Sequence, residues 1–324
     1  MSSTEIFDYY RTHTTFSEDD MATFSEDDMA AFRVYAQDPT NTTDGLMAIA
    51  GLTINLIENP WSEDNLMLLL TSCDGISPEA FERVVVGLLL VMIQHDTSIR
   101  RNKVLLGEIQ EVLTYAPELS FTALTNIART TQMKRMEQFN AQLTKELLPL
   151  MNNRESNEFY DIIRSRQSEM EHIAKMQLDQ NFLIFKEFYS TPFFREQAAN
   201  WLLPWTDNAI INIPEDDRDE IDSLIQMWPM CDSDKYALCH MYPSFKALIK
   251  SQLSVDSLRE VGMDMYGKTI ITNGYIQQLY RFFRLSSFAH AKPFDLASKL
   301  RELLVYRLVV VGTQAQQAIN QLLA

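Results

Sequence analysis

The stretch Cys73-Asp-Gly-Ile-Ser-Pro-Glu-Ala-Phe-Glu-Arg-Val-Val-Val-Gly-Leu-Leu-Leu-Val-Met-Ile-Gln-His95 ends one helix and begins the next. Ser77 is suited to cap a helix N-terminus, and Pro78 fits the first helical position, where its missing N–H is not needed. The helix that begins here runs to about His95. Its most apolar run, Val84 to Ile93, is too short to cross a bilayer, which requires roughly 20 residues. The stretch therefore predicts a buried helix and no membrane span.

Similar segments lie on both sides. A helix is predicted over 46–57, where Asn59-Pro60 stops it, and a short helix over 62–72. Another amphipathic helix is predicted over 98–114, with apolar residues at spacings of three and four: Val104, Leu105, Ile109, Val112 and Leu113. Short connections between helices of this length are typical of antiparallel helix pairs.

Two longer amphipathic stretches, residues 118–150 and 155–189, predict one long helical hairpin. The chain of 324 residues has 9 glycines and 11 prolines, fewer than the tight turns of an all-β or α/β protein need. Residue types that lose little rotamer freedom in a helix fill the long segments. We therefore predict an all-α fold, either an irregular helical-repeat array of α-α hairpins or two stacked helical bundles.

The composition changes after residue 190. Thr191 to Trp205 is aromatic and interrupted by proline, and an acidic loop over 212–220 leads into further helix. We predict an acidic N-terminal extension with a first helix over 1–43, a bundle of α-α hairpins over 44–190 and a second helical subdomain over 191–324. Helices beyond the break are expected at about 217–228, 233–241, 244–252, 273–287 and 294–321.

A tandem duplication lies near the N-terminus, where Phe16-Ser-Glu-Asp-Asp-Met-Ala-Thr23 is followed by Phe24-Ser-Glu-Asp-Asp-Met-Ala-Ala31. Each copy offers a serine N-cap with acids in the first turn, so either could begin the helix that continues through Phe32. We expect one copy to begin this helix and the other to remain an acidic extension. The sequence assigns no role to the duplication itself.

Charged residues are distributed unevenly over a chain of net charge −16. Residues 1–64 hold 13 acids and 2 bases, and residues 207–234 hold 9 acids and 1 base, whereas residues 235–324 hold 11 bases and 5 acids. Because so acidic a chain repels phosphate backbones, nucleic acid is not an expected partner. The acidic segments favour a basic protein partner.

Three cysteines, Cys73, Cys231 and Cys239, are too few and too unevenly spaced for a disulfide framework, so free thiols in a reducing compartment are expected. The N-terminus has early acids and lacks the apolar region of a secretory signal. We therefore predict a cytoplasmic protein. The last predicted helix, Leu296 to Leu323, reaches the chain end without a clear C-cap, which favours a truncated chain.

Two stretches carry a family resemblance: Phe185-Lys-Glu-Phe-Tyr-Ser-Thr-Pro-Phe-Phe-Arg-Glu-Gln-Ala-Ala-Asn-Trp-Leu-Leu-Pro-Trp205 and Met230-Cys-Asp-Ser-Asp-Lys-Tyr-Ala-Leu-Cys239. They resemble a group of large, uncharacterised cytoplasmic proteins of the Bacteroidetes that carry tetratricopeptide-type helical repeats. The resemblance covers roughly residues 80–245. It implies that this chain is the N-terminal part of a longer protein. The family lends no activity, and this sequence lacks a regular repeat of about 34 residues.

No motif for catalysis or cofactor binding is present. The histidines lie outside the zinc-protease and nucleophile-elbow patterns, and the glycine-rich nucleotide cradles are absent. Cys231 and Cys239-His240 come nearest to a metal site with Asp232 and Asp234, but zinc sites use closer cysteine pairs. We expect Cys239 to pack within a helix that these acids cap, with no metal and no cofactor. His172 is expected on an exposed helix face.

The strongest non-random feature is an aromatic cluster near the predicted break: Phe193, Phe194, Trp201, Trp205 and Trp228. Such rings form either a groove for a partner peptide or a seal between two helical bundles, and we favour the seal. The leading hypothesis is a non-enzymatic helical-repeat interaction or scaffold module that binds a protein partner. The alternatives are a structural or regulatory module that packs against the rest of a longer chain, and an enzyme of unknown type. The sequence gives no oligomeric state.

Overall fold

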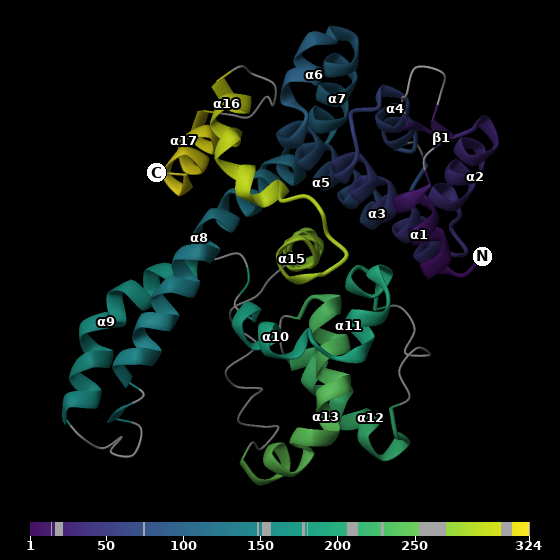
Figure 1. Cartoon of the computed structure of the whole chain (residues 1–324). Coiled ribbons are helices and arrows are strands. Elements are labelled where there is room, and N and C mark those ends of the chain that lie inside the picture. The colour runs from purple at the N-terminus through teal and green to yellow at the C-terminus, as the bar shows by residue number, and fades with distance from the viewer. Residues whose placement is uncertain are drawn as a thin grey trace.

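The computed structural model describes residues 1–13, 15–16, 22–73, 75–147, 149–150, 157–176, 179, 181–205, 213–227, 230–252, 270–305 and 313–323. The regular structure of these residues is helical, apart from the two-residue strands β1 (Thr15–Phe16) and β2 (Ala22–Thr23). The strands pair antiparallel, with Thr15 opposite Thr23. The all-α prediction is therefore confirmed (Figure 1).

The helices before residue 150 are α1 (Ser3–Thr12), α2 (Glu26–Gln37), α3 (Thr42–Glu58), α4 (Glu63–Thr71), α5 (Pro78–Gln94), α6 (Asp96–Arg101), α7 (Lys103–Tyr115) and α8 (Pro117–Leu147). The predictions over 46–57, 62–72 and 78–95 correspond closely to α3, α4 and α5. The prediction over 98–114 missed a break at Asn102, whose side chain caps α7 by accepting a hydrogen bond from the Leu105 N–H at 3.1 Å.

The helices after residue 150 are α9 (Asn157–Met176), α10 (Phe182–Phe188), α11 (Pro192–Glu196), η2 (Ala198–Trp201), α12 (Glu215–Met227), α13 (Asp232–Gln252), α15 (Ile270–Leu285), η4 (Pro293–Lys299), α16 (Leu300–Val305) and α17 (Thr313–Leu322). The predicted helix over 155–189 is therefore two helices, α9 and α10. The two helices predicted at 233–241 and 244–252 are one, α13, which contains Pro243. Within the described residues, the helix predicted over 294–321 begins as the 3₁₀ helix η4 and includes α16 and α17.

Helix α3 lies at the centre of the N-terminal helices, and its residues from Gly45 to Ile57 are buried. Helices α1 and α5 both pack on it. Helix α1 approaches so closely that a Cβ on Gly51 would lie 2.5 Å from the Phe7 carbonyl oxygen. Because no side chain fits in that space, the contact between α1 and α3 requires glycine.

Helix α1 was not among the predicted helices; only an acidic extension was expected ahead of the duplicated segment. A capping box formed by Ser2 and Glu5 begins the helix. Ile6, Phe7 and Tyr10 are fully buried against the core. The N-terminal segment is therefore part of the packed structure.

The second copy of the duplicated segment begins α2, as one of the two copies was expected to do. Ser25 caps the helix by accepting the Asp28 N–H at 3.2 Å, and Phe24 is buried. The Tyr9 hydroxyl donates to the Asp28 carboxylate, and the Tyr10 hydroxyl donates to the Asp28 carbonyl at 2.9 Å. Residues 17–21 of the first copy lie outside the described residues.

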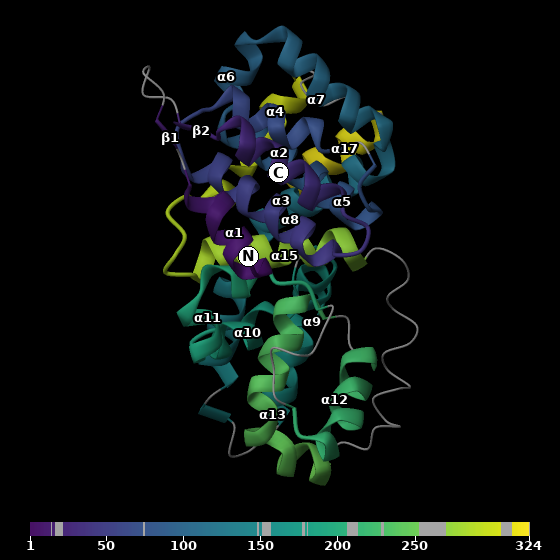
Figure 2. The ribbon, with the colours of Figure 1, turned by 90° about the vertical axis from the view of Figure 1, so that its right-hand side faces the viewer.

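Helix α15 lies between the N-terminal helices and the group formed by α10, α11, α12 and α13, as both views show (Figures 1 and 2). It contacts α5 and α8 on one side and η2 and α13 on the other. Helices α8 and α9 form a long pair that projects away from the remaining helices (Figure 1). Arg166 of α9 joins Glu146 of α8 at 2.7 Å.

One continuous set of buried apolar residues includes helices before and after residue 190. Helix η2 contacts α1, and Arg83 of α5 donates to the Leu202 carbonyl at 3.4 Å. The division of the chain into 1–43, 44–190 and 191–324 remains a prediction. Among the helices of the described residues, none has the length and apolar composition to cross a membrane.

Candidate functional site

Three rings of the predicted aromatic cluster are buried where α11 and η2 meet α10, α13 and α15. Phe193 and Phe194 are buried, and Trp201 is only 2% exposed. The Trp201 ring centroid lies 5.2 Å from that of Phe194 and 6.3 Å from that of Phe282 on α15. The Trp201 Nε1–H donates to the Phe194 carbonyl at 2.8 Å, which satisfies the buried indole. We call this region the aromatic junction.

The other two predicted partner-binding residues differ from these. Trp205 is partly buried, and its ring meets that of Tyr236 edge-on at 4.9 Å. The Tyr236 hydroxyl donates to the Pro204 carbonyl at 3.0 Å. Trp228 lies outside the described residues. Because the three buried rings already contact their own chain, this arrangement favours a seal between helices over a partner groove. A role in partner binding for Trp205 stays a prediction.

A buried ion cluster lies beside the aromatic junction. Arg281 on α15 is 0% exposed, and its Nε lies 2.6 Å from Asp179 Oδ2. Its Nη1 lies 2.7 Å from Asp234 Oδ1 at the start of α13. The guanidinium carbon also lies 4.2 Å from the centroid of the Phe185 ring of α10. One cation therefore joins three segments that are distant in the sequence.

The charges in this cluster hold one another in place. Burial by itself would lower the pKa of Arg281, but the carboxylates of Asp179 and Asp234 outweigh it and hold the pKa well above its usual value. Burial raises the pKa of the Asp179 carboxyl, and Arg281 opposes this. Burial also raises the pKa of the neighbouring Cys231 thiol, whose Sγ lies 3.2 Å from Ser233 Oγ. The cluster is suited to fixing α15 against α13, with a protonated thiol beside it.

The residues considered above as a possible metal site each have another structural role. Cys231 donates its backbone N–H to Asp234 Oδ2 at 3.3 Å, so the acid caps the start of α13. Cys239 packs within that helix, where burial raises the pKa of its thiol to about 12. The His240 ring lies 4.9 Å from the Phe193 ring. Within the described ranges there is no group of three residues that could hold a metal ion. His172 is exposed on α9, as expected.

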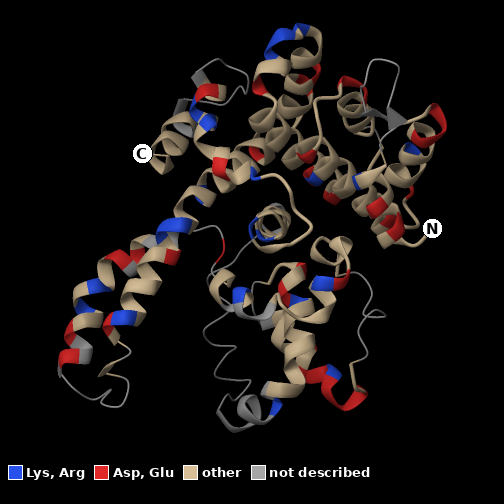
Figure 3. Ribbon diagram, in the orientation of Figure 1, with Lys and Arg blue, Asp and Glu red and all other residues tan. Residues whose placement is uncertain are grey.

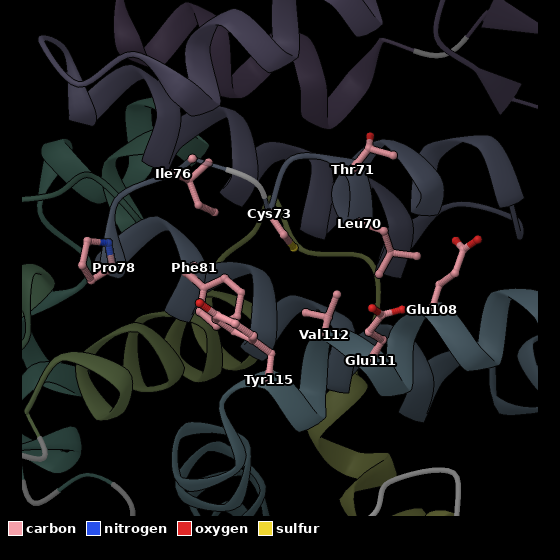
Figure 4. Close-up of a pocket in the computed structure, with 11 residues that line it drawn as sticks. Leu70, Thr71, Cys73, Ile76, Pro78, Phe81, Glu108, Glu111, Val112 and Tyr115 are labelled. Carbon is pink, nitrogen blue, oxygen red and sulfur yellow. The ribbon is translucent and has the colours of Figure 1, made fainter.

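An open hollow lies elsewhere, between the end of α4, the start of α5 and one face of α7 (Figure 4). Its volume is about 630 Å³. Its apolar lining consists of Leu70, Ile76, Pro78, Phe81, Val112 and Tyr115. Thr71, Cys73, Gly75, Glu108 and Glu111 complete it. We call this hollow the α7 groove; it lies within the roughly 300–1,000 Å³ typical of ligand pockets.

The connection between α4 and α5 shapes one side of the groove. Gly75 adopts a positive φ of 74°, a conformation that side chains disfavour. Ser77 then accepts the Ala80 N–H at 3.2 Å, and Pro78 begins α5. This tight turn and capped start place Cys73 and Ile76 against the groove.

Helix α7 has a buried face and an exposed apolar face. Leu105, Ile109 and Leu113 are buried, whereas Val104 is 74% exposed and Tyr115 is 83% exposed. At about 100° per residue, the five apolar positions predicted for this helix span about 180°, wider than one buried stripe requires. This excess width comes from Val104, which faces solvent; it does not mark the groove, whose lining on α7 is Glu108, Glu111, Val112 and Tyr115.

Charge in the groove has one sign. The charged side chains among its described lining residues are Glu108 and Glu111, both acids. They lie toward one end, and Phe81 and Tyr115 lie together toward the other, with ring centroids 5.9 Å apart (Figure 4). Acidic residues also gather in the first turn of α12, far from the groove (Figure 3). The α7 groove thus combines an apolar surface with two carboxylates.

Comparisons with protein-family models, with curated proteins and with solved structures gave no match to this chain. The resemblance to Bacteroidetes proteins with tetratricopeptide-type repeats therefore stays an expectation.

Proposed function

We propose that this chain is a non-enzymatic interaction module of helical hairpins that binds a segment of a protein partner in the α7 groove. The observation that carries the proposal is an apolar groove of about 630 Å³ left open to solvent. Packed interiors cover apolar surface, and an uncovered apolar hollow with a polar rim is typical of a binding site. Tyr115 adds a ring of the kind that is enriched among residues that dominate binding energy.

Other features support a binding role at this position. The groove is built on the ends of α4 and α5 and on α7, elements held by Leu69, Val84, Ile109 and their buried neighbours. A site on such rigid elements needs little ordering when a partner binds. Cys231 and Cys239 are free and buried, which supports a reducing compartment, and we propose the cytoplasm.

The test uses Cys73 as a chemical handle. Cys73 lines the groove and is partly exposed, whereas Cys231 and Cys239 are buried, so a bulky maleimide added to the folded chain reacts at Cys73. The labelled chain is used to recover partners from extracts of the cells that produce it, with quantitative mass spectrometry. We expect the bulky group to displace partners that the unlabelled chain retains.

A matched control carries the same label on another surface. The double variant Cys73→Ser/Val34→Cys places the thiol on α2, where Val34 is 68% exposed. This labelled variant should retain the partners. Equal recovery by both labelled chains would contradict binding in the groove, and recovery of nothing but the chain itself by the unlabelled protein would contradict an interaction role.

A further inference from the structure

We infer that the occupant of the α7 groove is an amphipathic helix of a partner protein with Lys or Arg beside its apolar stripe. The inference rests on the proposed function and adds the chemistry of the partner. It is drawn from the shape of the exposed face of α7 and from the sign of the charge that faces the groove.

The exposed face of α7 forms a continuous stripe. Glu108, Val112 and Tyr115 line the groove, and the exposed Val104 continues the same face of α7 one turn before them, so that the four follow one another at helical spacings of four, four and three. At a rise of 1.5 Å per residue, the stripe is about 17 Å long, which matches roughly three turns of a helix laid along it. Apolar residues of such a helix at positions i, i+4 and i+7 would contact Tyr115, Val112 and Leu70, the usual mode of helix-in-groove recognition.

The charge of the groove selects the flanking residues of that helix. Glu108 and Glu111 lie on adjacent turns, and neither forms an ion pair with another described residue. An apolar helix that covered them without supplying cations would remove two carboxylates from water at a cost. A helix with Lys or Arg at the matching positions would pair them. The net charge of −16 would also speed its approach.

The experiment uses two synthetic helical peptides of about 18 residues, long enough to form a helix in water or on binding. Both have leucines at i, i+3, i+4 and i+7; one has lysine and the other glutamate at the remaining positions. Binding to the full chain is measured by fluorescence anisotropy, and occupancy of the groove by the rate at which a small maleimide alkylates Cys73. The Leu/Lys peptide should bind, slow alkylation of Cys73 and lose affinity as salt rises.

The decisive variant removes the groove charges without changing shape. Glu108→Gln/Glu111→Gln should raise the Kd of the Leu/Lys peptide by about tenfold, as expected when two charge pairs are lost. The matched control, Glu215→Gln/Asp216→Asn, removes the same charge from exposed residues in the first turn of α12 and should change the Kd by less than about twofold. Equal weakening in both variants would show binding to overall negative charge and overturn the inference.

The outcomes separate this inference from the proposed function. If the Leu/Glu peptide protects Cys73 as well as the Leu/Lys peptide does, the groove binds helices without selecting cations, and only the inference fails. If neither peptide slows alkylation of Cys73 while the labelled Cys73 chain still retains its native partners, the groove is not a binding site, and both fail.

Discussion

In the aromatic junction and in the α7 groove, apolar side chains lie where helix ends meet, but neighbouring helices enclose only those of the junction. In the junction, α10, α13 and α15 enclose Phe194 and Trp201, and the indole N–H has an acceptor within its own chain. In the groove, Tyr115 is 83% exposed, and its ring meets that of Phe81 edge-on at 5.9 Å. Aromatic residue type alone does not distinguish a structural seal from a binding surface; the packing around it does.

The largest effect is expected from the ion cluster that supports the junction. Arg281→Met would leave Asp179 and Asp234 buried without their cation, and removal of one partner from such a cluster costs about 3–5 kcal/mol of unfolding free energy. Urea denaturation followed by circular dichroism measures this. The control is Arg284→Met on the same helix, where the side chain is 43% exposed. Its loss should be at most about 1 kcal/mol. Equal losses of unfolding free energy in the two variants would mean that burial of the Arg281 cluster does not add to its stabilising effect.

A comparable loss is expected from the centre of the junction. Trp201→Ala removes a buried ring and its hydrogen bond, and such truncations cost about 3–5 kcal/mol. The corresponding change in the groove, Tyr115→Ala, should alter the unfolding free energy by less than about 0.5 kcal/mol because the ring is exposed. If Tyr115→Ala destabilises the chain as much as Trp201→Ala does, the groove is part of the core and does not differ from the junction in packing.

A smaller effect, confined to binding, is expected in the groove. Tyr115→Ala should weaken retention of the native partner by about tenfold, a loss typical of an aromatic residue that contributes strongly to an interface. Quantitative recovery from cell extracts at several concentrations of the chain measures it. Val34→Ala on α2 changes another strongly exposed apolar residue and should leave recovery unchanged. An equal drop for both variants would point to a general effect of surface hydrophobicity.

The smallest effect is expected in how the unfolding free energy depends on pH, through the partly buried His95. Burial lowers the pKa of His95, a shift that its hydrogen bond to the Leu56 carbonyl opposes. The unfolded chain therefore takes up the proton at a higher pH than the folded chain. The stabilisation from neutral His95 is present above the unfolded pKa of about 6.5 and declines as pH falls through the folded pKa.

Unfolding free energies measured between neutral pH and about pH 5 should therefore decline, and His95→Gln should make that decline shallower. Glutamine can still donate to the Leu56 carbonyl but does not titrate. His172→Gln, on the exposed face of α9, is the matched control for the loss of a histidine. A profile that is identical with and without His95 would contradict the assigned shift.

The sequence predicted the helices whose signals are local. Ser77 and Pro78 mark the start of α5 correctly, since caps and first-turn prolines act within a few residues. Helix α1 was missed although Ser2 and Glu5 carry the capping-box pattern; the packing of Ile6, Phe7 and Tyr10 on α3 is visible only in the fold. The division of α6 from α7 at Asn102 was missed although asparagine is a common N-cap residue and its side chain caps α7.

The candidate site was predictable only in part. The preference for a seal over a groove at Phe193, Phe194 and Trp201 agrees with their burial. The α7 groove was not found, because whether Val112 and Tyr115 face the core or solvent depends on which helices pack beside α7. The Arg281 cluster was also invisible, since Asp179 lies 102 residues away along the chain and only the fold brings the two together.

Site-specific photo-cross-linking tests most directly whether the α7 groove, and not the aromatic junction, binds the partner. Benzoylphenylalanine is placed at Tyr115 in one chain and at the partly exposed Trp205 in another, and both are irradiated in extracts of the producing cells. We expect a covalent adduct with a partner protein from position 115 and only products within the chain from position 205. Partner adducts from position 205 with none from position 115 would contradict this expectation.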